Sequence, residues 1–143
     1  MEYQVVKRWK TIREERLGRV NELIAVIGSC GRHFFCYRGV VSWLEMDERG
    51  RIWFVDSWRG ARIYTHYHGR WKGFTGGGTL KCLVESLQHY VIKGTLLSRR
   101  HFWWPDWVCG GDLWAYGDDI GLVRSEAERL GLLMAPVRPS GVV

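Results

Sequence analysis

Residues 62–87, RIYTHYHGRWKGFTGGGTLKCLVESL, contain the change from strand to helix around which the fold is organised. In the first part, rings and cations alternate with other side chains, as in a strand with two distinct faces. A run of glycines then leads into a segment whose apolar side chains recur at helical intervals: Leu80, Leu83, Val84, Leu87 and Val91. We predict a helix that has Thr79 as its N-cap, runs to about Lys93 and ends at Gly94.

Upstream of this stretch, the chain has the pattern of strands separated by turn residues. The strand segments are HFFCYRG (33–39), VVSWLEMD (40–47), RIWFVDS (51–57) and ARIYTHYH (61–68). An antiparallel meander of three to five strands accounts for them. Before the strands, Thr11 and Glu14 have the spacing of a capping box, which predicts that a first helix starts there. Apolar residues recur at helical intervals from Leu17 to Ile27, and Gly31 supplies the stop.

Downstream, residues 95–117 are expected to be irregular but ordered, because they carry too many large rings to remain solvated. A short last helix is predicted from about Asp118 to Leu130, with Asp118 or Asp119 at its cap. The fold class that follows is α+β: an N-terminal helix, the meander, then helices packed on one face. Residues 1–143 are expected to form a single domain with a frayed tail over 134–143.

The chain carries a net charge of +6, and this charge is unevenly distributed. Residues 1–98 hold 16 lysines and arginines against nine acidic residues, whereas residues 99–143 hold five against six. Such an excess favours anionic partners. The charged side of the first helix mixes both signs and is expected to be solvated: Arg13, Glu14, Glu15, Arg16, Arg19 and Glu22. Without a long apolar run or an apolar leader, we expect a cytoplasmic protein with no membrane partner.

The four cysteines are widely scattered, and no pair has the spacing of a zinc knuckle or a redox motif. We expect them to be reduced and mostly buried. His66 and His68 are the best metal candidates, since alternate residues on a strand project from one face. No third ligand is fixed nearby, so we predict neither a metal nor a cofactor. No spacing joins a nucleophile to a base and an orienting group, which makes an enzyme the less favoured hypothesis.

The strand side that carries Arg62, Tyr64, His66 and His68 is the best candidate for a binding surface. Rings beside cations can stack on bases and contact phosphates. The exit of the strand adds Arg70, Trp71 and Lys72 to this candidate surface. An anion could also bind where the glycine run meets the next helix, at Gly77, Gly78 and Thr79. Glycines that only turn a strand into a helix explain that run equally well.

The segment HFWWPDWVCGGDLWAY (101–116) is rich in tryptophan and has two readings. Its rings can form a small core beneath a long loop, or an interface, since tryptophan is enriched where proteins bind one another. We expect core packing for two of its four tryptophans. The candidate interface residues are Trp103, Trp104 and Trp107.

Three blocks resemble a family of short, uncharacterised proteins associated with bacterial mobile elements, including integrative elements, plasmids and phages. They are RVNELIAVIGSCGRHFF (19–35), GRIWFVDSWRGARIYTHYHGRWKGFTGGGTL (50–80) and VCGGDLWAYG (108–117). The resemblance implies a bacterial cytoplasmic accessory protein and transfers no residue role.

Three functional hypotheses follow. The first is a non-catalytic protein that binds nucleic acid, or a complex containing it, through the basic aromatic strand. The second is an inhibitor that binds a host protein of a defence system, as anti-CRISPR proteins do. The third is a small metal- or histidine-dependent enzyme.

Overall fold

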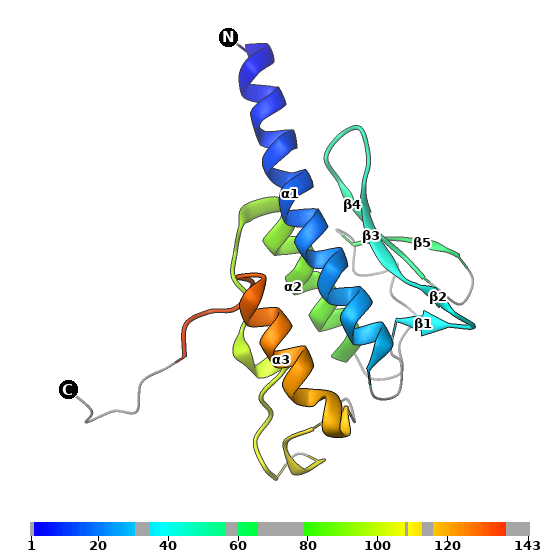
Figure 1. The fold of residues 1–143 in the computed structure, drawn as a ribbon. Helices are drawn as coiled ribbons and strands as arrows, with labels where there is room; N and C mark the ends of the chain where they lie inside the picture. The colour runs from blue at the N-terminus through cyan, green and yellow to red at the C-terminus, as the bar shows by residue number, and fades with distance from the viewer. Residues whose placement is uncertain are drawn as a thin grey trace, which may run out of the picture.

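The computed structural model describes residues 2–30, 35–56, 60–65, 79–107, 109–112 and 116–136. Three helices and five short strands make up most of this part of the chain (Figure 1). The helices are α1 (Glu2–Ser29), α2 (Thr79–Lys93) and α3 (Ile120–Arg129). The strands are β1 (Cys36–Tyr37), β2 (Val40–Val41), β3 (Trp43–Met46), β4 (Ile52–Val55) and β5 (Arg62–Tyr64). One-turn 3₁₀ helices follow α2: η2 (Arg99–His101), η3 (Cys109–Gly111) and η4 (Gly117–Asp119). The α+β fold is confirmed.

The strands form two antiparallel sheets. β1 and β2 make a hairpin, and β3, β4 and β5 make a three-stranded meander in that order. In the meander, Leu44 pairs with Phe54, and Phe54 pairs with Ile63. The segment predicted as one strand over 40–47 is divided at Ser42 between β2 and β3, and the Ser42 amide donates to the carbonyl of Phe35 (2.6 Å) at the open end of the β1–β2 hairpin.

Helix α1 lies between the sheet and the other two helices (Figure 1). Its apolar stripe is the centre of the core, and its buried residues are Val20, Leu23, Ile24 and Ile27. The sheet contributes Leu44, Ile52 and Phe54 from its inner face. Helix α2 adds Leu83, Val84, Leu87 and Val91, and α3 adds Val123 and Ala127. The helical stripes read from the sequence therefore meet one another in a single core.

One prediction about α1 is wrong and another holds only in part, since Glu14, Glu15, Arg19 and Glu22 are exposed as expected. The helix begins at Glu2 and not at Thr11, because residues 2–10 contain neither glycine nor proline to break it. Its charged side is not simply solvated either. The Arg13 guanidinium donates to the carbonyl of Gly50 (3.0 Å), that of Arg16 to the carbonyl of Val91 (3.4 Å), and that of Arg19 to the hydroxyl of Tyr90 (3.1 Å). These arginines connect α1 to the β3–β4 turn and to the end of α2.

The ends of the later helices follow the predicted glycines. α2 stops before Gly94, whose φ of +75° is in the left-handed region. Residues of η4 lead directly into α3, and Asp119 makes no side-chain cap hydrogen bond there. The Asp112 carboxylate instead accepts from the amides of Tyr116 (2.9 Å) and Gly117 (2.8 Å).

The chain after α3 runs beside the segment after α2. The Leu97 amide donates to the carbonyl of Leu132 (2.8 Å), and the Met134 amide donates to the carbonyl of Leu97 (2.9 Å). Residues 137–143 of the predicted frayed tail lie outside the described residues.

Candidate nucleic-acid interface

The face of the β3–β5 sheet that points away from α1 carries a cluster of rings and charges. It is called the outer sheet face below, and its residues are Trp43, Glu45, Asp47, Arg51, Trp53, Arg62 and Tyr64. They alternate along the strands with buried Leu44, Phe54 and Ile63, so the inner face packs on the core while these seven side chains are exposed or half-buried. Val55, which the register places on the outer face between Trp43 and Arg62, is itself buried. In the strand register, Trp53 pairs with Glu45 on one side and with Tyr64 on the other.

Four side chains of this face lie one against the next across β4 and β5. The Trp53 and Tyr64 rings have centroids 4.9 Å apart and are tilted by 31°. The Arg62 guanidinium carbon lies 4.5 Å from the Trp53 ring centroid, and that of Arg51 lies 5.6 Å from the Tyr64 ring centroid. Such distances fit cation–π contacts. The result is a surface of π faces and planar guanidinium groups on the β3–β5 sheet.

Glu45 joins two parts of this surface. Its Oε1 atom is 2.6 Å from Nε of Arg62, and its Oε2 atom accepts a longer hydrogen bond from the indole N–H of Trp43 (3.3 Å). The side chains of Arg62 and Glu45 are 50% and 37% exposed, so this ion pair is open to solvent and to exchange with a ligand. Trp43 is itself 40% exposed at the end of the face.

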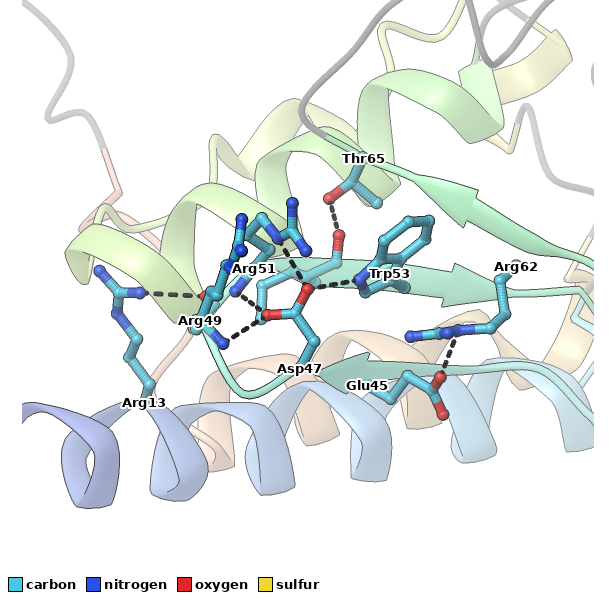
Figure 2. Close-up of polar contacts among 10 residues, drawn as sticks. Arg13, Glu45, Asp47, Arg49, Arg51, Trp53, Arg62 and Thr65 are labelled. Atoms are coloured by element: carbon cyan, nitrogen blue, oxygen red, sulfur yellow. Dashed lines mark hydrogen bonds and ion pairs between the residues drawn. The ribbon is translucent and has the colours of Figure 1, made fainter. Parts of the chain in front are cut away.

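Asp47 organises the turn between β3 and β4 (Figure 2). Its Oδ1 atom accepts from the amides of Arg49 and Arg51, both at 2.9 Å. Its Oδ2 atom accepts from Nε of Arg51 (2.7 Å) and from the indole N–H of Trp53 (3.0 Å). Desolvation alone would raise the pKa of Asp47, but the hydrogen bonds from Trp53, Arg51 and Arg49 outweigh it and hold the pKa well below its ordinary value.

The tip of this turn rests against the first half of α1. Gly50 has a φ of +78°, and a Cβ atom placed on it would come within 2.5 Å of an Arg13 nitrogen and 2.7 Å of the Trp9 ring. The Arg13 guanidinium also lies 4.4 Å from the Trp9 ring centroid. Figure 2 shows Arg13 reaching up from α1 to the Gly50 carbonyl. A close approach of two elements therefore requires glycine here.

The predicted two faces of the 61–68 strand are confirmed as far as the strand is described. Ile63 and Thr65 are buried, and Arg62 and Tyr64 lie on the other side. The Thr65 hydroxyl donates to the carbonyl of Ile52 (2.6 Å), which attaches the end of β5 to β4 (Figure 2).

Most of the remaining predicted binding residues lie outside the described residues: His66, His68, Arg70, Trp71, Lys72, Gly77 and Gly78. Thr79 is the first residue of α2. The predicted surface and the enzyme hypothesis centred on His66 and His68 are thus untested at these positions. Within the part of the chain that is described, no three His, Cys, Asp or Glu side chains gather as metal ligands. Cys30, Cys36 and Cys82 are free thiols, and of these three only Cys30 is buried, whereas Cys36 is half-buried and Cys82 is exposed.

The tryptophans of the 101–116 segment lie in different environments. Trp103 is packed between two guanidinium groups, with the carbons of Arg99 and Arg124 at 4.1 and 4.9 Å from its ring centroid. Trp104 packs against the core, and its indole N–H is buried without a hydrogen-bond acceptor among the described residues. Trp107 is 86% exposed. Two rings are thus structural and one is open to a partner, while Trp114 lies outside the described residues.

A serine–histidine pair lies apart from the outer sheet face. Oγ of Ser86 in α2 is 3.0 Å from Nε2 of His101 in η2. The pKa of His101 is below its ordinary value because burial disfavours the imidazolium. Both partners are half-buried, and the pair connects α2 to the tryptophan-rich segment.

Several members of the outer sheet face were missed by sequence reasoning. Only Arg62 and Tyr64 were predicted, whereas Trp43, Glu45, Asp47, Arg51 and Trp53 were not. These residues could have been found from the two-residue alternation that β3 and β4 share with β5. In neighbouring antiparallel strands, directly opposite residues lie on the same face of the sheet. The turn role of Asp47 also has a signal, because aspartate before a glycine turn often accepts backbone amides.

Among the described residues, no helix is both long enough and apolar enough to cross a membrane. Comparison with known proteins gives a family. Residues 11–137 match the family YoqU. The chain is 24% identical over 122 residues to the "SPbeta prophage-derived uncharacterized protein YoqU" of Bacillus subtilis (strain 168). The aligned residues cover 83% of each of the two chains. No solved structure matches the chain. The resemblance to a family of bacterial mobile elements is thereby confirmed, and the chain belongs to the YoqU family.

Proposed function

We propose that this protein is a non-catalytic nucleic-acid-binding protein and that the outer sheet face is its binding surface. The observation that carries the proposal is the stack of Tyr64, Trp53 and Arg62 across two strands. Sheets that present aromatic rings are effective platforms for unpaired bases, which stack on rings and on guanidinium planes alike. Each stacked base contributes about 1–3 kcal/mol to binding.

The geometry supports this role in a second way. The position of the Trp53 ring is fixed, because its indole N–H donates to Asp47. The β3–β4 turn is itself fixed by the hydrogen bond from Arg13 of α1. A platform that is already ordered loses little conformational entropy when a ligand binds. The net positive charge of residues 1–98 would favour approach of a polyanion.

The test is fluorescence anisotropy with labelled single-stranded DNA and RNA of about 12 nucleotides, a length within the usual range for one small domain. We expect Arg62→Ala to weaken binding severalfold, since it removes a stacking plane and leaves Glu45 facing the ligand uncompensated. Arg100→Ala is the matched control, because Arg100 is an exposed arginine outside the outer sheet face. Equal affinity of both variants and the unmodified protein would contradict the assignment of the site.

A second candidate is a protein–protein inhibitor, and Trp107 is the observation that favours it. A tryptophan with 86% of its surface exposed is a common anchor in protein interfaces. Under this hypothesis Trp107→Ala abolishes capture of a host defence protein, while Arg62→Ala leaves capture unchanged. Loss of capture in Arg62→Ala, with capture unchanged in Trp107→Ala, would instead favour the outer sheet face as the binding surface.

The cellular setting is part of the proposal. The Bacillus relative is named as prophage-derived, and we infer the same kind of setting for this chain: a mobile-element protein acting in the bacterial cytoplasm. Host nucleic acid and host defence complexes are both accessible there.

A further inference from the structure

Each arginine of the outer sheet face has an acidic partner on that face. Nε of Arg62 is 2.6 Å from Glu45, and Nε of Arg51 is 2.7 Å from Asp47. Each guanidinium also lies over a ring, Arg62 over Trp53 and Arg51 over Tyr64. Two cations are thus balanced by two carboxylates in the same small area.

This balance affects two kinds of nucleic acid differently. A duplex presents phosphates on its outside and keeps its bases stacked inside, so its non-specific binding depends on uncompensated cations. A single strand can turn its bases outward to stack on rings and guanidinium planes. A face with neutralised arginines and partly exposed rings therefore retains what a single strand needs and lacks what a duplex needs.

We propose that the outer sheet face selects single-stranded over double-stranded nucleic acid, and that Glu45 is the residue that sets this selectivity. The inference rests on the proposed function and specifies its ligand. Glu45 neutralises Arg62 and places a negative charge beside Trp43, where a phosphate backbone would otherwise approach. A ligand that binds through phosphates must displace or repel this carboxylate, whereas a base that stacks on the rings need not.

Glu45 is a better candidate for this role than Asp47. Asp47 accepts two backbone amides and two side-chain donors, and its side chain is only 17% exposed. Its removal would disturb the turn itself. Glu45 is held by two side chains and is 37% exposed, so its charge can be removed while the strand pairing is kept.

The experiment compares the unmodified protein with Glu45→Gln, using one labelled strand of about 12 nucleotides and the matching duplex. Binding is measured by anisotropy between about 50 and 200 mM salt. Glu48→Gln is the matched control, since Glu48 is exposed on the β3–β4 turn and its substitution changes the net charge equally. Thermal unfolding of each variant shows whether the fold is kept.

We expect the unmodified protein to bind the single strand about tenfold or more tightly than the duplex, with a salt slope that indicates about one phosphate contact or fewer. Glu45→Gln should raise duplex affinity about fivefold at low salt and steepen the duplex slope by about 0.9, the value for one added phosphate contact. Glu48→Gln should leave the ratio of the two affinities within about twofold.

Three results would overturn the inference. Equal binding of strand and duplex by the unmodified protein, or the same response to Glu45→Gln and Glu48→Gln, would remove Glu45 as the selecting residue and leave the proposed function standing. Absence of binding to either nucleic acid, even at low salt, would overturn the proposed function and the inference together.

Discussion

Asn21 of α1 binds both backbone polar groups of Leu44 in β3. Its side-chain N–H donates to the carbonyl of Leu44 (2.8 Å), and its Oδ1 atom accepts from the amide of Leu44 (2.7 Å). The asparagine amide thus takes the place of a neighbouring strand at this edge of the sheet. It also fixes the position of α1 along β3, because it matches the backbone at one residue only.

Asn21→Ala should lower the free energy of unfolding by about 1–3 kcal/mol, since it leaves the backbone groups of Leu44 without these partners. Asn21→Asp keeps the acceptor but sets an anion against the Leu44 carbonyl, so it should be no better than alanine at neutral pH. Urea unfolding measures both variants. A loss below about 0.5 kcal/mol for Asn21→Ala would mean that water replaces the amide.

Gly50→Ala should destabilise the protein by about 1–2 kcal/mol, because a left-handed φ disfavours any Cβ and because Arg13 and Trp9 occupy the space it needs. The matched control is Gly18→Ala in the exposed middle of α1, where nothing lies within 4 Å of the added atom. That substitution should stabilise by about 0.5–1 kcal/mol through helix propensity. Loss of stability in both variants, measured by thermal unfolding, would argue against this account of Gly50.

The apolar periodicities predicted the helical stripes and the meander, because burial of a stripe or of one strand face leaves a repeat in the sequence. The start of α1 could not be predicted in this way. Residues 2–10 lie beyond the apolar stripe, and Thr11 and Glu14 have the spacing of a cap although they lie inside the helix. The spacing of a capping box is a local feature of the sequence. It does not reveal that Trp9 and Arg13 contact the β3–β4 turn, which is distant in sequence.

The lowered pKa of Asp47 makes part of the stability depend on pH. A carboxylate whose pKa is lower in the folded than in the unfolded chain stabilises fully above its ordinary value of 3.8. This contribution is lost as the pH falls from there toward the folded pKa. The free-energy difference between the unmodified protein and Asp47→Asn should therefore shrink below about pH 3.8. A difference that stays constant with pH would show that the carboxylate charge has no part in holding the turn.

His101 should produce a second pH dependence in a different window. Its pKa is lowered by burial from the ordinary 6.5, so the folded protein favours the neutral ring. Stability is then complete above pH 6.5 and falls as the pH drops toward the folded pKa, because the unfolded chain takes up the proton more readily. His101→Gln should abolish this slope and His89→Gln, at an exposed position of α2, should keep it. An unchanged slope in His101→Gln would assign it to another group.

The candidate site was predicted only in part, for physical reasons. Arg62 and Tyr64 lie where the alternation of β5 put them. The contribution of Glu45 and Trp43 depends on which strands are neighbours and on their register, which a periodic pattern does not fix. The sequence does not distinguish the environments of the tryptophans at 103, 104 and 107. Only the packing of the folded chain shows that two of these rings are structural and one is exposed.

The most direct test of the central claim is photochemical cross-linking of a bromouracil-substituted single strand, followed by mass spectrometry of the cross-linked peptides. Stacking on the outer sheet face predicts cross-links at Trp43, Trp53 or Tyr64, and their loss in Arg62→Ala. Cross-links confined to residues 102–107, with none on the sheet, would contradict the account and place the nucleic acid on the tryptophan-rich segment instead.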